Sequence, residues 1–245
     1  MSPSGLVHPA LPRAEPVCEA DPVFKPYVTA AVFTITVVPS LLQLAVPGLE
    51  AAWMRDPAAI AAGEWWRPVT ALLVQDGGVF GTLANLAFLA VLGYVAERAL
   101  GPRRWLTLYA AGAVAGESAG YLLHQPGAGN SVALCGLAAG LALLAGDRPA
   151  RSLGAFYAVV SGVWLLAGLG TWGVVAMVVL TAAGFQLVVH RERLPQWLPV
   201  AVPVAAALVL AALGDLHGYA LLAGIIVGWI LKEAWPSTFR RTNPA

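Results

Sequence analysis

Long apolar blocks dominate the chain, and short polar segments separate them. A bilayer core is about 30 Å thick and a helix rises about 1.5 Å per residue, so a span needs roughly 20 mostly apolar residues. Eight segments meet this requirement, at residues 27–46, 78–96, 105–122, 131–146, 152–169, 171–189, 197–213 and 216–231. The runs are too long for barrel strands and do not alternate with period two. The pattern predicts an all-α, polytopic transmembrane helical bundle with about eight spans.

The composition leads to the same class of protein. Apolar residues make up 59% of the chain and charged residues only 11%. A soluble domain of 245 residues could not bury that much apolar surface. The lipid bilayer is therefore the first expected partner. Nucleic acid is not expected, because no basic patch with interleaved aromatic residues occurs in the sequence.

The positions of lysine and arginine predict the orientation. Positive residues near span ends are retained on the cytoplasmic side. With the N-terminus inside, only Arg55 and Arg67 fall outside. We therefore expect a multi-pass protein of the plasma (cytoplasmic) membrane with both termini cytoplasmic. The alanine, glycine and arginine usage favours a GC-rich bacterium as the source.

The polar ends of the chain set the expected domain boundaries. Residues 1–26 are rich in proline and are predicted to be a disordered cytoplasmic tail. Residues 27–235 form the expected membrane domain, and 236–245 a second cytoplasmic tail. Cys18 and Cys135 are far apart in sequence and predict neither a disulfide nor a metal site. We expect no cofactor and no metal.

Two reactive residues, Cys135 and His217, stand near the starts of two of the apolar blocks. A thiol and an imidazole can together perform nucleophilic catalysis, because the imidazole can take the proton of the nucleophile. The alternative is structural: Cys135 allows close helix contact, and His217 is capped by a neighbour such as Asp215. Glu117, in the middle of the third span, is either a buried partnered residue or part of a polar path, which would permit a proton-coupled transporter.

Four motifs, taken in order, resemble the rhomboid family of intramembrane proteases. They are Glu64-Trp65-Trp66-Arg67 with Thr70; Gly77-Gly78 and Asn85 followed by Gly93, Glu97-Arg98 and Gly101; Ser131-Val132-Ala133-Leu134-Cys135-Gly136 with Gly140; and His217 with Ala223-Gly224 and Gly228. The third is similar to the Gly-x-Ser-Gly nucleophile segment of the family, and the fourth to its last core helix. The resemblance covers most of 27–146 and 197–232, which leaves 152–189 as an extra helix pair outside a rhomboid-like core.

The resemblance implies a Ser-His dyad and an oxyanion site, but several positions depart from the pattern. Cys135 stands where the family has serine, and Ala133 stands at its first glycine. The two histidines that precede the oxyanion asparagine fall on Asp76 and Gly81, so only Asn85 remains. Losing one oxyanion donor typically costs about 100-fold to 1000-fold in rate.

Three functions therefore stay open on sequence alone. The first is a rhomboid-like intramembrane endopeptidase that cleaves transmembrane segments of membrane proteins, with a catalytic Cys135–His217 dyad and Asn85 at the oxyanion. The second is an inactive pseudoprotease that binds such segments, and the third is the proton-coupled transporter. Hydrogen-bond reach between the Cys135 sulfur and His217 would favour the enzyme.

Glycine spacing predicts that the two helices that carry Cys135 and His217 touch. Gly136 and Gly140 on one, and Gly224 and Gly228 on the other, form small-x-x-x-small pairs that permit close backbone approach in lipid. An odd number of spans separates the two helices, so both would run inward from the outer face.

Overall fold

The computed structural model describes residues 24–234, without the side chains of residues 167 and 168. Cys18 and the predicted tails, except residues 24–26, lie outside this range. Every described element is helical, and only one isolated bridge, between Arg55 and Gly127, has extended pairing. The prediction of an all-α bundle is confirmed.

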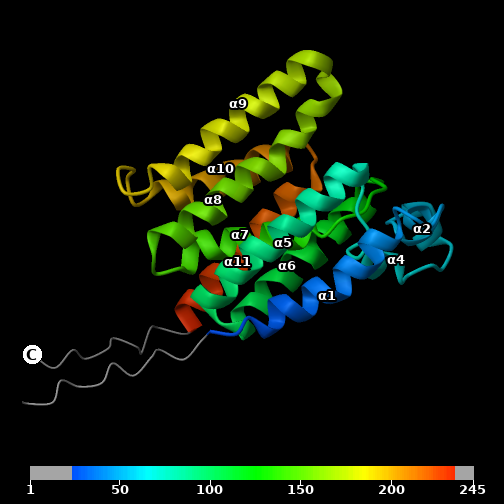
Figure 1. Ribbon diagram of the computed structural model, residues 1–245, viewed down its shortest axis with the longest axis horizontal. Coiled ribbons are helices and arrows are strands. Elements are labelled where there is room, and N and C mark those ends of the chain that lie inside the picture. Colours follow the sequence, from blue (N-terminus) through cyan, green and yellow to red (C-terminus); the bar gives the residue numbers. More distant parts are fainter. Residues whose placement is uncertain (1–23, 235–245) are drawn as a thin grey trace, which may run out of the picture.

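Eight principal helices coincide with the eight predicted spans (Figure 1). By length and apolar composition, three described helices are long enough to cross a membrane by themselves: α5, α9 and α11. A 3-10 segment, η1, joins α8 to α9, and three short helices lie between α1 and α5. The bounds are α1 Tyr27–Leu42, α2 Leu49–Trp53, α3 Pro57–Ala61, α4 Arg67–Thr70, α5 Gly78–Leu100, α6 Pro102–Leu122, α7 Ser131–Leu144, α8 Arg148–Val163, η1 Trp164–Leu169, α9 Gly170–Val189, α10 Leu198–Ala212 and α11 Leu216–Ala234.

Helix α7 lies at the centre of the bundle and packs against α5, α6, α8, α10 and α11. Its small residues allow this. A Cβ added at Gly136 would lie 2.6 Å from the Cα of Gly112 on α6, and one added at Gly224 would lie 2.8 Å from the Cα of Gly136. Backbone therefore meets backbone at the junction of α6, α7 and α11, and the glycine spacing predicted the contact between α7 and α11.

The segment between α1 and α5 is held by its own polar side chains. Asp56 caps α3 by accepting hydrogen bonds from the backbone N–H groups of Ala58 and Ala59. Arg67 donates to Glu64 Oε2 at 2.6 Å, and also to the carbonyl oxygens of Ala51 and Met54. These bonds tie α2 and α4 into one compact unit at the end of the bundle where α5 begins.

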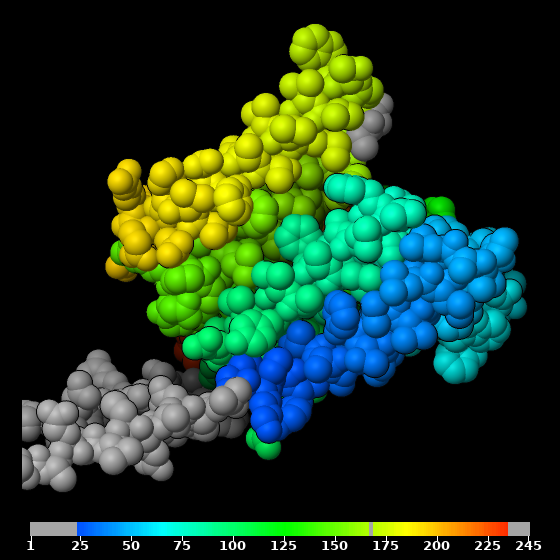
Figure 2. All heavy atoms as spheres, viewed as in Figure 1, coloured from blue at the N-terminus to red at the C-terminus, as the bar shows by residue number. Residues whose placement is uncertain are grey.

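The helices α8 and α9 differ in how they join the bundle. Helix α8 packs on α7 and lies beside α5, where the rings of Phe88 and Tyr157 are 4.9 Å apart. Helix α9 packs mainly on α8 and η1, and it stands at the edge of the molecule (Figures 1 and 2). The sequence predicted 152–189 as an extra pair outside the core. In the structure α8 contributes Ala150, Tyr157 and Ala158 to the hydrophobic core, whereas the described residues of that core include none of α9.

Candidate active site

Ser131 and His217 meet at one end of the bundle. Ser131 is the first residue of α7 and His217 lies in the first turn of α11. Their side chains are joined by a hydrogen bond of 2.9 Å between Ser131 Oγ and His217 Nε2. A hydroxyl within hydrogen-bond reach of an imidazole is the arrangement that a serine nucleophile and its general base require.

Asp215 orients the other side of the imidazole. It precedes α11, and its Oδ1 accepts the backbone N–H of His217 at 2.8 Å, as an N-cap residue does. The same oxygen lies 2.8 Å from His217 Nδ1. Burial alone would raise the pKa of Asp215, but its hydrogen bond and charge interaction with His217 outweigh burial and lower it. An ionised carboxylate can only accept, so Nδ1 carries the proton and Nε2 is free to accept one from Ser131.

Asn85 stands across the site on α5. Its Nδ2 donates to Gln75 Oε1 at 2.9 Å, and the same oxygen accepts the backbone N–H of Asn130 at 3.2 Å. A Cβ added at Gly129 would lie 3.3 Å from Asn85 Nδ2 and 3.6 Å from Ser131 Oγ. Asn85 and Ser131 therefore border one small space, which Gly129 leaves open by having no side chain.

A cavity of about 240 Å³ extends from this space. The walls combine backbone of glycine-rich loops with apolar side chains of α5 and α8, and His217 and Ser131 both contribute to the lining. The remaining lining residues are Arg55, Asp76, Gly77, Gly81, Ala84, Asn85, Phe88, Pro126, Gly127, Ala128, Gly129, Val132, Tyr157, Val160, Ser161, Trp164 and Leu216. An apolar cavity with a few convergent polar groups is typical of a site that binds a ligand or substrate.

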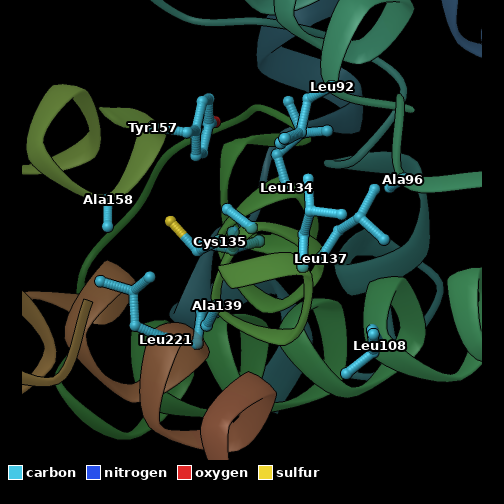
Figure 3. Close-up of a cluster of buried hydrophobic side chains, with 14 of the residues drawn as sticks. Leu92, Ala96, Leu108, Leu134, Cys135, Leu137, Ala139, Tyr157, Ala158 and Leu221 are labelled. Carbon is cyan, nitrogen blue, oxygen red and sulfur yellow. The ribbon is translucent and has the colours of Figure 1, made fainter. Parts of the chain in front are cut away.

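Cys135 lies one helical turn deeper than Ser131 and belongs to the hydrophobic core. It is fully buried, and its sulfur points toward the side of Tyr157 and Ala158 (Figure 3). Within residues 24–234 the hydrogen bonds of the His217 ring go to Ser131 and Asp215, and none goes to Cys135. The Cys135–His217 dyad expected from the sequence is not formed, and a Ser131–His217 pair takes its place.

The physical reason for this error is the helical repeat. Residues i and i+4 share one face of a helix, so Ser131 and Cys135 both point toward α11 and α8. Cys135-Gly136 resembles the nucleophile-glycine pair of the family pattern, but it lies one turn further along the helix than Ser131. Gly129-Asn130-Ser131 is the signal that could have identified the serine, because it restores the glycine two residues before the nucleophile. Val132 then replaces the glycine that follows.

Two residues at the cavity have roles that are mainly structural. A Cβ at Gly81 would collide with the carbonyl oxygen of Asp76, so the tight turn into α5 excludes a side chain here. Arg55 pairs with Glu117 at 2.8 Å, and both side chains are buried. Glu117 is thus a partnered residue and is not among the described residues that line the cavity.

Among residues 24–234, no group of three or more His, Cys, Asp or Glu side chains could hold a metal ion.

Comparison with known proteins gives one result. The family model described as Rhomboid domain matches residues 62–234, which contain Asn85, Ser131, Asp215 and His217. Neither the curated proteins nor the solved structures include a match to this chain.

Proposed function

Because the chain belongs to the rhomboid family, a family of multi-pass membrane proteins that act on transmembrane segments, we propose that it is an intramembrane endopeptidase of the serine type. Ser131 is the proposed nucleophile, His217 the general base, and Asp215 the residue that holds the base in its tautomer. The single observation that carries the proposal is the continuous line from Ser131 Oγ through His217 to Asp215, with two contacts of 2.9 Å and 2.8 Å.

The reaction follows from this arrangement. His217 Nε2 takes the proton of Ser131 as Oγ attacks the scissile carbonyl carbon of the substrate. The resulting oxyanion is stabilised by the second N–H of Asn85 Nδ2 and by the backbone N–H of Ser131, which lies in the first turn of α7 and has no partner inside that helix. His217 then gives its proton to the leaving amine. In the second half of the reaction, His217 takes a proton from water as the water oxygen attacks the acyl carbon. It then returns the proton to Ser131 Oγ as the ester bond breaks.

The proposed substrate is a transmembrane segment of another membrane protein. Residues of α5 and α8 line the cavity, and Phe80 of α5 and Trp164 at the start of η1 have ring centroids 6.1 Å apart. The distribution of lysine and arginine supports a plasma-membrane location with cytoplasmic termini. In that orientation the site lies near the outer face.

The pseudoprotease remains the second candidate, and Gly81 favours it. A side chain at this position would collide with Asp76, so no side-chain donor can supplement Asn85 from there. A site with one side-chain oxyanion donor has less transition-state stabilisation, and cleavage would be correspondingly slow. Such a protein would still hold a transmembrane segment in the cavity.

The test is cleavage of a model transmembrane substrate by purified protein in liposomes. Ser131→Ala and His217→Ala are expected to lose at least about 1000-fold in kcat. Cys135→Ala is the matched control, because it lies one turn away on the same helix; it is expected to keep activity within about threefold of the wild type. Loss of activity in Cys135→Ala with retention in Ser131→Ala would reverse the assignment. A wild type that crosslinks to the substrate without cleaving it would establish the pseudoprotease.

A further inference from the structure

We propose that Gln75 is a positioning residue for the oxyanion site, and that α1 takes part in catalysis through it. The inference rests on the proposed serine endopeptidase activity. It adds a residue that is not itself in contact with the reacting atoms but determines how Asn85 and the start of α7 face them.

Gln75 is fully buried and makes hydrogen bonds in three directions. Its Oε1 accepts from Asn85 Nδ2 at 2.9 Å and from the backbone N–H of Asn130 at 3.2 Å. Its Nε2 donates to Ser40 Oγ on α1 at 3.2 Å. One amide oxygen thus joins the oxyanion asparagine to the residue immediately before the nucleophile.

The backbone contact determines the orientation of both amides. A backbone N–H is always a donor, so the Gln75 atom that faces Asn130 must be the oxygen. Asn85 shares that oxygen and must therefore present its nitrogen to it. With Gln75 in place, Asn85 directs N–H groups toward the Ser131 side of the site. Without it, the Asn85 amide can turn over and present a carbonyl oxygen, which would repel a developing oxyanion.

Helix α1 holds Gln75 by its backbone as well as by its side chain. The Gln43 side chain accepts from the Gln75 N–H at 2.8 Å and donates to the Gln75 carbonyl at 2.6 Å. Ser40 Oγ also donates to the carbonyl of Leu73 at 2.9 Å. At its other end α1 is anchored by Glu97, whose carboxylate accepts the N–H groups of Val28 and Thr29.

These contacts give α1 a role in the site although it precedes the residues that the family model matches, 62–234. The polar residues Ser40 and Gln43 lie in the last turn and at the C-cap of a mainly apolar helix. Buried polar side chains are retained at a cost unless each finds a partner. Here both partners belong to the segment that carries Gln75.

The experiment compares Gln75→Met with Gln75→Glu in the liposome assay. Methionine keeps the length of the side chain and removes the acceptor, and we expect kcat to fall about 10-fold to 100-fold with KM within about twofold. A glutamate at this fully buried position is expected to be neutral, so its carbonyl oxygen accepts from Asn85 and Asn130 and its O–H donates to Ser40 Oγ, as the amide does. We expect Gln75→Glu to recover most of the lost kcat. Thr34→Ala, an exposed change on α1, is the control and is expected to match the wild type.

A double-mutant cycle separates positioning from general destabilisation. If Gln75 acts through Asn85, Gln75→Met in the Asn85→Ala background adds less than about threefold to the loss in kcat. Losses that multiply would overturn the inference, as would a Gln75→Met protein with wild-type kcat. The unfolding midpoint in detergent is recorded for every variant. If Gln75→Met does not fold, Gln75→Glu decides: low kcat in a folded protein overturns the inference.

The result also distinguishes the two proposals. Wild-type cleavage with no effect of Gln75→Met removes the positioning role and leaves the endopeptidase in place. If the wild type does not cleave the substrate, the rate of Ser131 modification by a fluorophosphonate probe replaces kcat, and the same ratios are expected. A wild type that neither cleaves nor reacts with the probe overturns both.

Discussion

Helices α7 and α9 are both apolar enough for a membrane, yet they lie in different surroundings. Eleven of the 14 residues of α7 are buried in the protein. Of the 20 residues of α9, only Gly173 and Gly184 are buried. Figure 2 shows α9 on the outside of the bundle. Lipid and protein interior are equally apolar, so hydrophobicity does not separate these two cases. The size of the side chains does: α7 is rich in alanine and glycine, and α9 carries large exposed side chains such as Trp172 and Val178.

Removal of one polar group near the first turn of α7 and of one on α9 is expected to give the largest contrast. Asp215→Asn keeps the size of the side chain but removes the charge that fixes the His217 tautomer, so kcat should fall between about 100-fold and 10,000-fold. Gln186→Leu on α9 removes a side-chain amide that, among residues 24–234, bonds only to the carbonyl of Ala182 on its own helix. We expect wild-type kcat for it. Cleavage assays with both purified proteins check this, and an unchanged kcat in Asp215→Asn would reduce Asp215 to a helix cap.

Enlarging a small side chain should give the next largest difference between α7 and α9. Gly136→Val puts methyl groups against the backbone of Gly112 and Leu108, where no space exists. We expect the free energy of unfolding to fall by about 3 kcal/mol. Ala183→Val on the exposed face of α9 is the matched change and should cost less than about 0.5 kcal/mol. Detergent unfolding curves provide the measurement, and similar losses at both positions would mean that α9 is also packed against protein.

Shortening a side chain should give a smaller difference in stability between α7 and α9, in the same direction. Leu137 is fully buried on α7, and Val178 on α9 is 64% exposed. Leu137→Ala leaves a cavity whose lining loses dispersion contacts, at an expected cost of about 2 kcal/mol. Val178→Ala exchanges one lipid contact for another, so the free energy of unfolding should change by nearly zero. The same unfolding curves test this pair, and a large loss in Val178→Ala would show that an unrecognised partner covers α9.

The smallest expected effect lies at the border between the two regions, on α8. Tyr157 donates its O–H to the carbonyl of Ser131 at 3.4 Å, a long hydrogen bond that joins α8 to the nucleophile. Tyr157→Phe should lower kcat less than about threefold, because the ring still packs on Phe88. Tyr219→Phe, at an exposed position on α11, is the control. A loss of more than 10-fold in kcat, about 1.4 kcal/mol, would make this bond part of the catalytic geometry.

Much of the fold was accessible from the sequence. The apolar blocks gave the eight helices, and the glycine pairs at Gly136 and Gly224 predicted a contact that the structure confirms. Both signals are local: span length follows from the thickness of the bilayer, and close backbone approach follows from the absence of a Cβ. The position of α8 was not accessible, since its aromatic contact with Phe88 joins segments about 70 residues apart and has no local signature.

The candidate site shows the same division within a few residues. The motifs point to His217 and Asn85, but they favour Cys135 over Ser131, because a helix repeats its face every turn and a motif can match one turn out of register. No sequence motif marks Gln75. A glutamine in a loop gains its role only when the fold brings Ser40, Asn85 and Asn130 within hydrogen-bond distance of its side chain.

The sequence by itself determined that this is a helical membrane protein, where its eight principal helices lie and which small residues allow them to touch, because these properties depend on the side chains of one segment and on the bilayer. The tertiary structure alone decided which hydroxyl or thiol meets His217, which helix lines the cavity and which amide orients Asn85. Those outcomes depend on distances of about 3 Å between groups far apart in the chain, and hydrogen bonds are made or lost over much less than one helical turn.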